Sequence, residues 1–184
     1  LKKATNSPFE KNITTKLKHQ IISVNGDANK ALINQFVDNM SVRDSRAFRK
    51  YLEELEPDDI ERSLMLWVNY PSNPTGAIAD LNAIADWGRA NEIPIFSDEC
   101  YAEFTWSQSP QTILNNGLSG VVAVHSLSKR SNLAGIRAGF YAGDEDLVHW
   151  LKEIRKHSGK MVPGPVQTAA ALAYSDDDHV ETDQ

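Results

Sequence analysis

The spacing of hydrophobic and polar positions changes near Pro57, which divides the chain into two parts. Before it, residues 1–56 are polar and lysine-rich, and their apolar residues recur at helical spacing in two stretches. This spacing predicts helices over residues 28–40 and 41–55. Ser41 is the expected N-cap of the second helix, and Pro57 is expected to end it because proline disfavours a helical residue before it.

After Pro57, apolar runs alternate with amphipathic stretches. The short apolar runs predict strands over residues 64–70, 93–97, 121–125 and 138–142. The amphipathic stretches predict helices over residues 80–90, 144–157 and 163–174. We expect the first strand, a continuous apolar run, to be buried on both faces of a parallel sheet. The alternation indicates an α/β fold with a mostly parallel sheet, although the close spacing of the last two strands leaves an antiparallel pair open.

Two predicted helices have clear N-cap residues, and the second of them also has an apolar face. Asp80 and Asp144 are the expected N-caps of the helices that follow them. On the helix over residues 144–157, Leu147, Trp150 and Ile154 fall on one face, as expected for a stripe that packs against other parts of the protein.

Composition and charge narrow the class of protein. The chain has 184 residues, 41% of them hydrophobic, which is enough to bury the core of a domain. Its net charge of −6 argues against general binding to nucleic acids or anionic membranes, and no apolar run approaches the length of a membrane span. The single cysteine, Cys100, excludes an internal disulfide and fits a reducing compartment. We therefore expect a cytoplasmic protein without nucleic-acid or membrane partners.

The ends of the chain differ in charge. Residues 1–20 are rich in lysine, whereas residues 176–184 form an acidic tail. We expect both ends to be solvated and frayed, because like charges repel one another and bury little surface. The expected organisation is a mainly helical segment of unassigned role over residues 1–56, an α/β unit over residues 57–175, and this tail.

Polar motifs follow the ends of the predicted strands. They are Asn73-Pro-Thr-Gly76, Asp98-Glu-Cys-Tyr101 and Ser126-Leu-Ser-Lys129, with Arg137 eight residues after the lysine. In open α/β sheets, ligands bind beyond the carboxyl ends of the strands, so these motifs are expected to meet at one site.

In this order and spacing, the motifs resemble those of the fold-type I pyridoxal-phosphate-dependent aminotransferases of class I/II, over about residues 60–175. The string Trp67–Gly76 is most similar to the N-succinyldiaminopimelate aminotransferases of lysine biosynthesis. The resemblance implies that residues 57–175 are part of a pyridoxal-phosphate-binding large domain. It further implies a homodimer that transfers an amino group between an amino acid such as glutamate and a keto acid.

The resemblance also assigns roles at the ring of the cofactor. Lys129 is the Schiff-base lysine, and its freed amine then shuttles a proton. Asp98 keeps the pyridine nitrogen protonated. Asn73 and Tyr101 donate hydrogen bonds to the ring oxygen, and Tyr101 is counted among the catalytic residues with Lys129 and Asp98.

At the phosphate end, the resemblance assigns Arg137 as the bidentate partner and Ser126 and Ser128 as hydrogen-bond donors. Each residue also has a plain structural interpretation. Asp98 fits a helix cap and Asn73 a turn. Tyr101 fits a packing role, Arg137 a structural ion pair, and Ser128 a turn after a strand.

Neighbouring polar residues carry weaker signals. Cys100 is expected to be a small buried apolar residue and not a nucleophile. Glu99 and His125 are expected to have structural roles. The five histidines show no metal-ligand spacing, so no metal site is predicted.

Three alternatives differ in function class. Ser126-x-x-Lys129 also fits serine–lysine hydrolases, but their companion Ser-Asp-Asn and Lys-Thr-Gly motifs do not occur. Another fold-type I enzyme, a lyase or decarboxylase, could use the same lysine, carboxylate and arginine. Residues 36–51 resemble a segment of baseplate-hub proteins of T4-like phages, which implies a chimeric, non-catalytic structural or assembly protein.

Parts of the family pattern have no counterpart in the sequence. Residues 1–56 contain neither a glycine- and serine-rich phosphate loop nor the aromatic residue that stacks on the cofactor, and the arginine that binds the substrate carboxylate is also absent. We therefore expect these 184 residues alone to turn over poorly or not at all.

Overall fold

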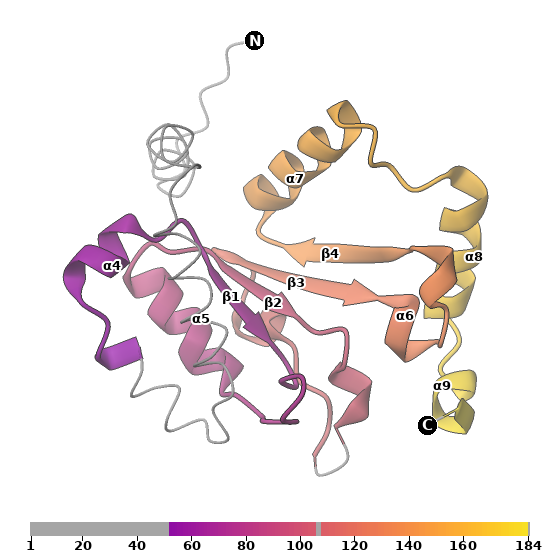
Figure 1. The fold of residues 1–184 in the computed structure, drawn as a ribbon, viewed down its shortest axis with the longest axis horizontal. Coiled ribbons are helices and arrows are strands. Elements are labelled where there is room, and N and C mark those ends of the chain that lie inside the picture. The colour runs from indigo at the N-terminus through magenta and orange to yellow at the C-terminus, as the bar shows by residue number, and fades with distance from the viewer. Residues whose placement is uncertain (1–51, 106–107, 184) are drawn as a thin grey trace.

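The computed structural model describes residues 52–105 and 108–183. The described part contains a four-stranded sheet in the order β1-β2-β3-β4 (Figure 1). The strands are β1 (Leu66–Asn69), β2 (Ile95–Asp98), β3 (Val121–Ser126) and β4 (Gly139–Gly143). The first three run parallel, and β4 runs antiparallel to β3. The predicted α/β fold with a mostly parallel sheet is confirmed.

The antiparallel pairing of β3 with β4 follows from what joins them. The connection contains α6 (Leu127–Arg130) and the 3-10 helix η3 (Ala134–Ile136). Neither is a crossover helix of the kind that usually returns the chain for a parallel strand. Of the two arrangements that the sequence left open, the structure has the antiparallel one.

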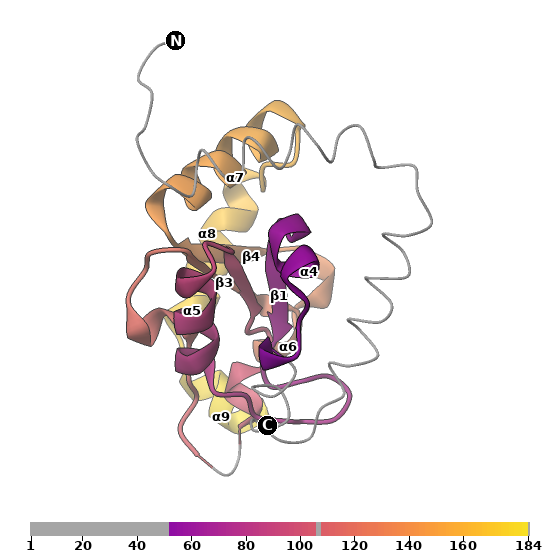
Figure 2. The ribbon, with the colours of Figure 1, turned by 90° about the vertical axis from the view of Figure 1, so that its left-hand side faces the viewer.

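The other helices surround this sheet. They are α4 (Pro57–Arg62), α5 (Leu81–Ala90), α7 (Glu145–His157), α8 (Gly164–Tyr174) and α9 (Asp178–Asp183), with short 3-10 helices η1 (Ala102–Phe104) and η2 (Ile113–Asn116). Figure 2 shows α5 on one side of the sheet, and Figure 1 shows α7 and α8 beside β4. None of the helices in the described ranges has the length and apolar character needed to cross a membrane.

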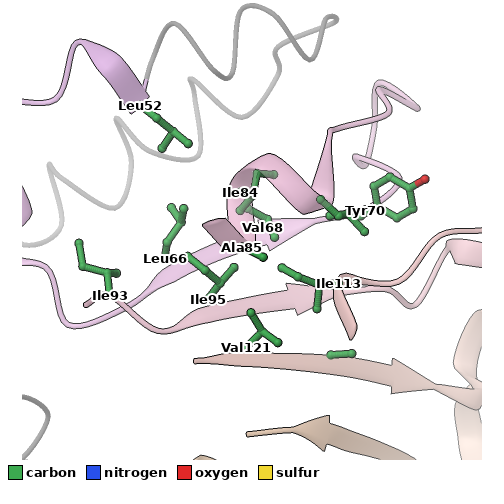
Figure 3. Close-up of a cluster of buried hydrophobic side chains, with 12 residues drawn as sticks. Leu52, Leu66, Val68, Tyr70, Ile84, Ala85, Ile93, Ile95, Ile113 and Val121 are labelled. Atoms are coloured by element: carbon green, nitrogen blue, oxygen red, sulfur yellow. The ribbon is translucent and has the colours of Figure 1, made fainter. Parts of the chain in front are cut away.

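Helix α5 and strands β1 to β3 form the hydrophobic core. Asp80 caps α5 as predicted, because its carboxylate accepts a hydrogen bond from the Ala83 amide over 3.0 Å. Ile84 and Ala85 of α5 point toward Val68 of β1 and the neighbouring strands (Figure 3). This packing fixes the three parallel strands, and with them the positions of the turns that follow.

Helix α7 begins as predicted but packs less than its periodicity suggests. Asp144 accepts hydrogen bonds from the amides of Asp146 and Leu147, each over 3.1 Å. Leu147 is buried, whereas Trp150 is 47% exposed and Ile154 is 57% exposed. The described residues therefore leave most of the apolar stripe of α7 exposed.

Two sequence predictions near β1 are corrected. The first strand is not buried on both faces, because Leu66 and Val68 are buried while Trp67 between them is 38% exposed. Pro57 does not simply end a helix. It is the first residue of α4, where the missing amide hydrogen costs nothing because the first turn of a helix leaves its amides unbonded.

The acidic tail is not frayed. Residues 178–183 form α9, Val180 is 6% exposed, and the Asp177 carboxylate pairs with Arg130. The prediction failed because charge repulsion within the tail is offset by a buried arginine that lies far away in the sequence.

Predictions for the N-terminal part fall outside the described residues. These are the helix over residues 28–40, most of the helix over residues 41–55 with its cap Ser41, and the resemblance over residues 36–51. Leu52 is described, and it is 5% exposed within the core cluster. The division of the chain at residues 56 and 175 stays a prediction.

Candidate active site

A cavity of about 540 Å³ opens at the carboxyl ends of the parallel strands. Its lining residues are Trp67, Asn69, Ser72, Asn73, Pro74, Asp98, Cys100, Tyr101, Ser126, Ser128 and Lys129. They include six of the residues predicted from the sequence: Asn73, Asp98, Tyr101, Ser126, Ser128 and Lys129. The volume lies within the range of about 300–1,000 Å³ that is common for small-molecule sites.

Strand register brings these residues together. Asn69 at the end of β1 pairs with Asp98 at the end of β2, and Asp98 pairs with Val124 of β3. Asn69 was not predicted as a site residue, yet it contacts residues on both sides of the cavity. The side-chain amide nitrogen of Asn69 lies 3.4 Å from the Asp98 carbonyl oxygen. The side-chain oxygen of Asn69 accepts a hydrogen bond from the backbone amide of Asn73 over 2.6 Å. The signal available in the sequence was that Asn69 is a polar residue near the end of an apolar run.

The turns after β1 and β2 are joined directly. The side-chain amide of Asn73 donates a hydrogen bond to the Tyr101 hydroxyl over 3.1 Å. The Lys129 amine lies 5.9 Å from the centre of the Tyr101 ring, at a distance that allows a cation–π contact. Among the described residues Lys129 forms no ion pair. An amide, a phenol and an amine therefore converge on one end of the cavity.

Two serines lie where β3 passes into α6. Ser126 caps α6 by accepting a hydrogen bond from the Ser128 amide over 3.1 Å. The Ser126 hydroxyl also donates to the Ser128 hydroxyl oxygen over 2.9 Å, which leaves the Ser128 proton able to donate elsewhere. The pair thus presents a hydroxyl donor to the cavity.

Asp98 and Cys100 form the side of the cavity after β2. One Asp98 carboxylate oxygen accepts from the Cys100 amide over 3.2 Å. Burial raises the pKa of the Cys100 thiol to about 12, and a hydrogen bond to Asp98 acts in the same direction. Cys100 is half-buried at the cavity wall, and its thiol is protonated near neutral pH, so it is a poor nucleophile.

Arg137 is the predicted site residue that does not line this cavity. Its backbone is in the left-handed region, with φ 55° and ψ 42°, and its side chain is exposed. The guanidinium donates to the Ala134 carbonyl oxygen over 3.0 Å. The spacing of the motifs along the sequence does not determine the direction of the Arg137 side chain, so its role at the phosphate stays a prediction.

Glu99 is fully buried and does not line the cavity. One of its carboxylate oxygens accepts from the Ile113 amide over 2.8 Å. The His125 Nε2 lies 3.3 Å from the other carboxylate oxygen, without the alignment of a hydrogen bond. Both residues are thus placed as structural partners. In the described ranges, no group of three or more His, Cys, Asp or Glu side chains could hold a metal ion.

Comparison with known proteins identifies the family. A family model described as aminotransferase class I and II matches residues 35–184. The chain belongs to the class I and II aminotransferases. Members of this family use pyridoxal phosphate. The match is longer than the predicted 60–175 and contains residues 36–51, so the comparisons do not favour a phage structural protein.

Relatives and solved structures agree with this assignment. The 4-dedimethylamino-4-oxo-anhydrotetracycline transaminase OxyQ of Streptomyces rimosus is 45% identical over 125 residues, which are 64% of this chain and 35% of the relative. An LL-diaminopimelate aminotransferase of Aquifex aeolicus is 31% identical over 140 residues, 73% of this chain and 36% of the relative. A solved aminotransferase from Neisseria meningitidis aligns with a TM-score of 0.65 and 31% identity over 71% of this chain and 36% of that structure. The chain thus spans about a third of the length of the curated relatives it matches.

The residues around the cavity fit the cofactor of this aminotransferase family. Pyridoxal phosphate has an aldehyde, a ring hydroxyl, a ring nitrogen and a phosphate. The cavity offers an amine on Lys129, a carboxylate on Asp98, and amide and hydroxyl donors on Asn73, Tyr101 and Ser128. These groups therefore complement the aldehyde, the ring nitrogen and the ring hydroxyl of the cofactor, and the Ser128 hydroxyl provides a donor for its phosphate.

Proposed function

We propose that this chain forms the cofactor-binding floor of an aminotransferase that transfers an amino group between an amino acid such as glutamate and a keto acid. The observation that carries the proposal is the convergence of Asn73, Asp98, Tyr101 and Lys129 from three strand ends on one cavity. The membership of the family supports the reaction class.

Each residue near the ring has a defined role in this proposal. Pyridoxal phosphate, when bound, supplies an electron-withdrawing ring that weakens the Cα–H bond of the amino-acid substrate. Lys129 holds the cofactor through its amine and then moves the proton from Cα. Asp98 keeps the proton on the pyridine nitrogen, because a carboxylate beside that nitrogen favours its charged form. Asn73 and Tyr101 orient the ring by donating hydrogen bonds to its oxygen.

Ser128 and Arg137 are the proposed ligands of the phosphate. Ser128 has a hydroxyl proton available at the cavity, and Ser126 fixes the position of that hydroxyl. We assign Arg137 as the cation for the phosphate, which requires its guanidinium to leave the Ala134 carbonyl oxygen. An exposed side chain with one such bond can reorient at small cost.

The keto-acid substrate is proposed from the resemblance of Trp67–Gly76 to N-succinyldiaminopimelate aminotransferases. We infer a tricarboxylic keto acid of the lysine pathway, the succinylated 2-amino-6-oxopimelate. The Aquifex aeolicus relative named for LL-diaminopimelate supports this class, whereas the Streptomyces rimosus relative is named for 4-dedimethylamino-4-oxo-anhydrotetracycline.

We further propose a cytoplasmic homodimer. The exposed apolar side chains support an additional contact surface, because monomers seldom leave large apolar patches uncovered. Trp150 and Ile154 on α7 and Leu172 on α8, which is 72% exposed, are candidates for such contacts.

Transfer of ¹⁵N tests the proposed reaction. The purified protein is incubated with pyridoxal phosphate, ¹⁵N-glutamate and a panel of keto acids, and the products are analysed by mass spectrometry. Because these 184 residues alone are expected to turn over poorly, we expect slow transfer of ¹⁵N to a new amino acid. The rate should fall by at least a further about 10²-fold in Lys129→Ala but not in Lys160→Ala on the exposed loop after α7. Release of carbon dioxide or an elimination product without ¹⁵N transfer would instead indicate a decarboxylase or lyase.

A further inference from the structure

Arg130, the residue after Lys129, is buried and bonded on several sides. Its side chain is 8% exposed. The guanidinium donates to Glu103 Oε1 over 3.0 Å and to the Ala173 carbonyl oxygen over 2.9 Å. It also pairs with the Asp177 carboxylate and lies 5.6 Å from the centre of the Tyr174 ring. A buried arginine with this many partners is held in one orientation.

Burial of this arginine needs these partners. An unpaired guanidinium in the interior would carry a large desolvation penalty, which the two carboxylates and the carbonyl oxygens offset. The partners come from two distant segments, since Glu103 lies on η1 and Asp177 lies between α8 and α9. Arg130 therefore ties α6 to both segments at once.

The position of α6 depends on such external contacts. It has four residues, fewer than a helix needs to be stable by itself. Glu103 belongs to η1, which begins directly after Tyr101, so the Glu103–Arg130 pair connects the segments that carry Tyr101 and Lys129. Those two residues face each other at the cavity, with the Lys129 amine 5.9 Å from the Tyr101 ring centre.

We propose that Arg130 is a positioning residue that sets the location of the Lys129 amine, with Glu103 and the segment over residues 173–177 acting through it. The inference rests on the proposed function, because it concerns the amine that binds the cofactor. It assigns the end of the described chain a role in the site, although that end does not line the cavity.

Three variants test this inference by cofactor binding rather than by turnover. Arg130→Lys keeps the charge but loses the planar fork, and Asp177→Asn removes one exposed partner. Arg155→Lys is the matched control, since Arg155 is a partly exposed arginine on α7, outside the cavity, that donates to the Lys160 carbonyl oxygen over 2.7 Å. The purified proteins are titrated with pyridoxal phosphate, and the absorbance of the bound cofactor gives its dissociation constant and the pH midpoint of its spectrum.

We expect the dissociation constant to rise about tenfold in Arg130→Lys, because a charge-assisted contact near the site is lost. In Asp177→Asn we expect a rise of about threefold, since exposed pairs contribute less. The pH midpoint should shift in Arg130→Lys, because it reports the surroundings of the Lys129 nitrogen, and the control should match the wild type. A purely structural role would lower the thermal midpoint and leave both binding values of the folded protein unchanged.

Unchanged binding and an unchanged pH midpoint in folded Arg130→Lys would overturn the inference. If that variant does not fold, Asp177→Asn decides in the same way, with weaker binding in support and wild-type binding against. A wild-type protein that binds no cofactor would overturn the proposed function and this inference with it. If the wild-type protein binds the cofactor and the variants have the same dissociation constant and pH midpoint, the inference alone is overturned.

Discussion

The side-chain amide of Asn73 lies 3.1 Å from the Tyr101 hydroxyl and joins the turn after β1 to the turn after β2. Tyr101 in turn faces the Lys129 amine, which follows β3. The three parallel strands thus contribute one polar group each to the same end of the cavity.

Loss of the Tyr101 hydroxyl should weaken cofactor binding without unfolding the protein. Tyr101→Phe removes the partner of Asn73 and a donor for the ring oxygen, so we expect the dissociation constant of pyridoxal phosphate to rise about five- to tenfold. Absorbance titration measures this change. Tyr141→Phe on β4, outside the cavity, is the control and should bind as the wild type does. Equal affinities in the two variants would contradict the assigned role of Tyr101.

Gly88 permits the close approach of α5 to the sheet. A Cβ atom at this position would lie 2.5 Å from Ile95 Cγ1 and 2.8 Å from the Ile93 carbonyl oxygen. Gly88→Ala should therefore lower the free energy of unfolding by about 1–3 kcal/mol, measured by urea denaturation. A Cβ atom at Gly164 would have no atom within 4 Å, so Gly164→Ala should change the free energy of unfolding by less than about 0.5 kcal/mol. Similar stability of both variants would refute this account of the packing.

Glu99 should matter for stability through the hydrogen bond that it accepts. Glu99→Leu leaves the buried Ile113 amide without its acceptor and should cost about 1–3 kcal/mol of unfolding free energy. Glu99→Gln keeps an acceptor oxygen and should cost less. If Gln were as destabilising as Leu, the negative charge beside His125, and not the bond to Ile113, would be the important contribution.

Cys100 should make the stability depend on pH above neutrality. Burial, with help from Asp98, raises the pKa of its thiol from 9.0 to about 12, so the folded state keeps a proton that the unfolded chain loses. The contribution of the protonated Cys100 thiol to the free energy of unfolding is complete below pH 9 and is lost as the pH rises toward 12. Urea denaturation at pH 8 and pH 10 should therefore show a smaller decrease in stability for Cys100→Ala than for the wild type. An identical decrease in both proteins would show that Cys100 does not contribute.

The sequence predicted the parts of this fold that depend on local signals. Asp80 and Asp144 mark helix starts because an N-cap acts on amides two or three residues away. Asn73, Asp98 and Lys129 meet because parallel strands end at the same edge of the sheet, so their order along the chain was enough to predict one site.

Contacts between residues far apart in the chain leave no local signal in the sequence. The tail is ordered because Asp177 pairs with Arg130, which lies 47 residues earlier in the chain. The direction of the Arg137 side chain depends on a left-handed backbone that its residue type does not signal. The exposure of Trp67 depends on which surfaces cover the sheet, and an apolar run alone does not specify them.

The central claim is that Lys129 is the amine that holds the cofactor in a formed site. The direct test is to add pyridoxal phosphate to the purified protein, reduce with borohydride, and map the modified peptide by mass spectrometry. We predict saturable labelling at Lys129 that is strongly reduced in Asp98→Ala and retained in the surface variant Asp58→Ala. Labelling scattered over surface lysines, or equal labelling of Lys129 in the Asp98 variant, would contradict the account.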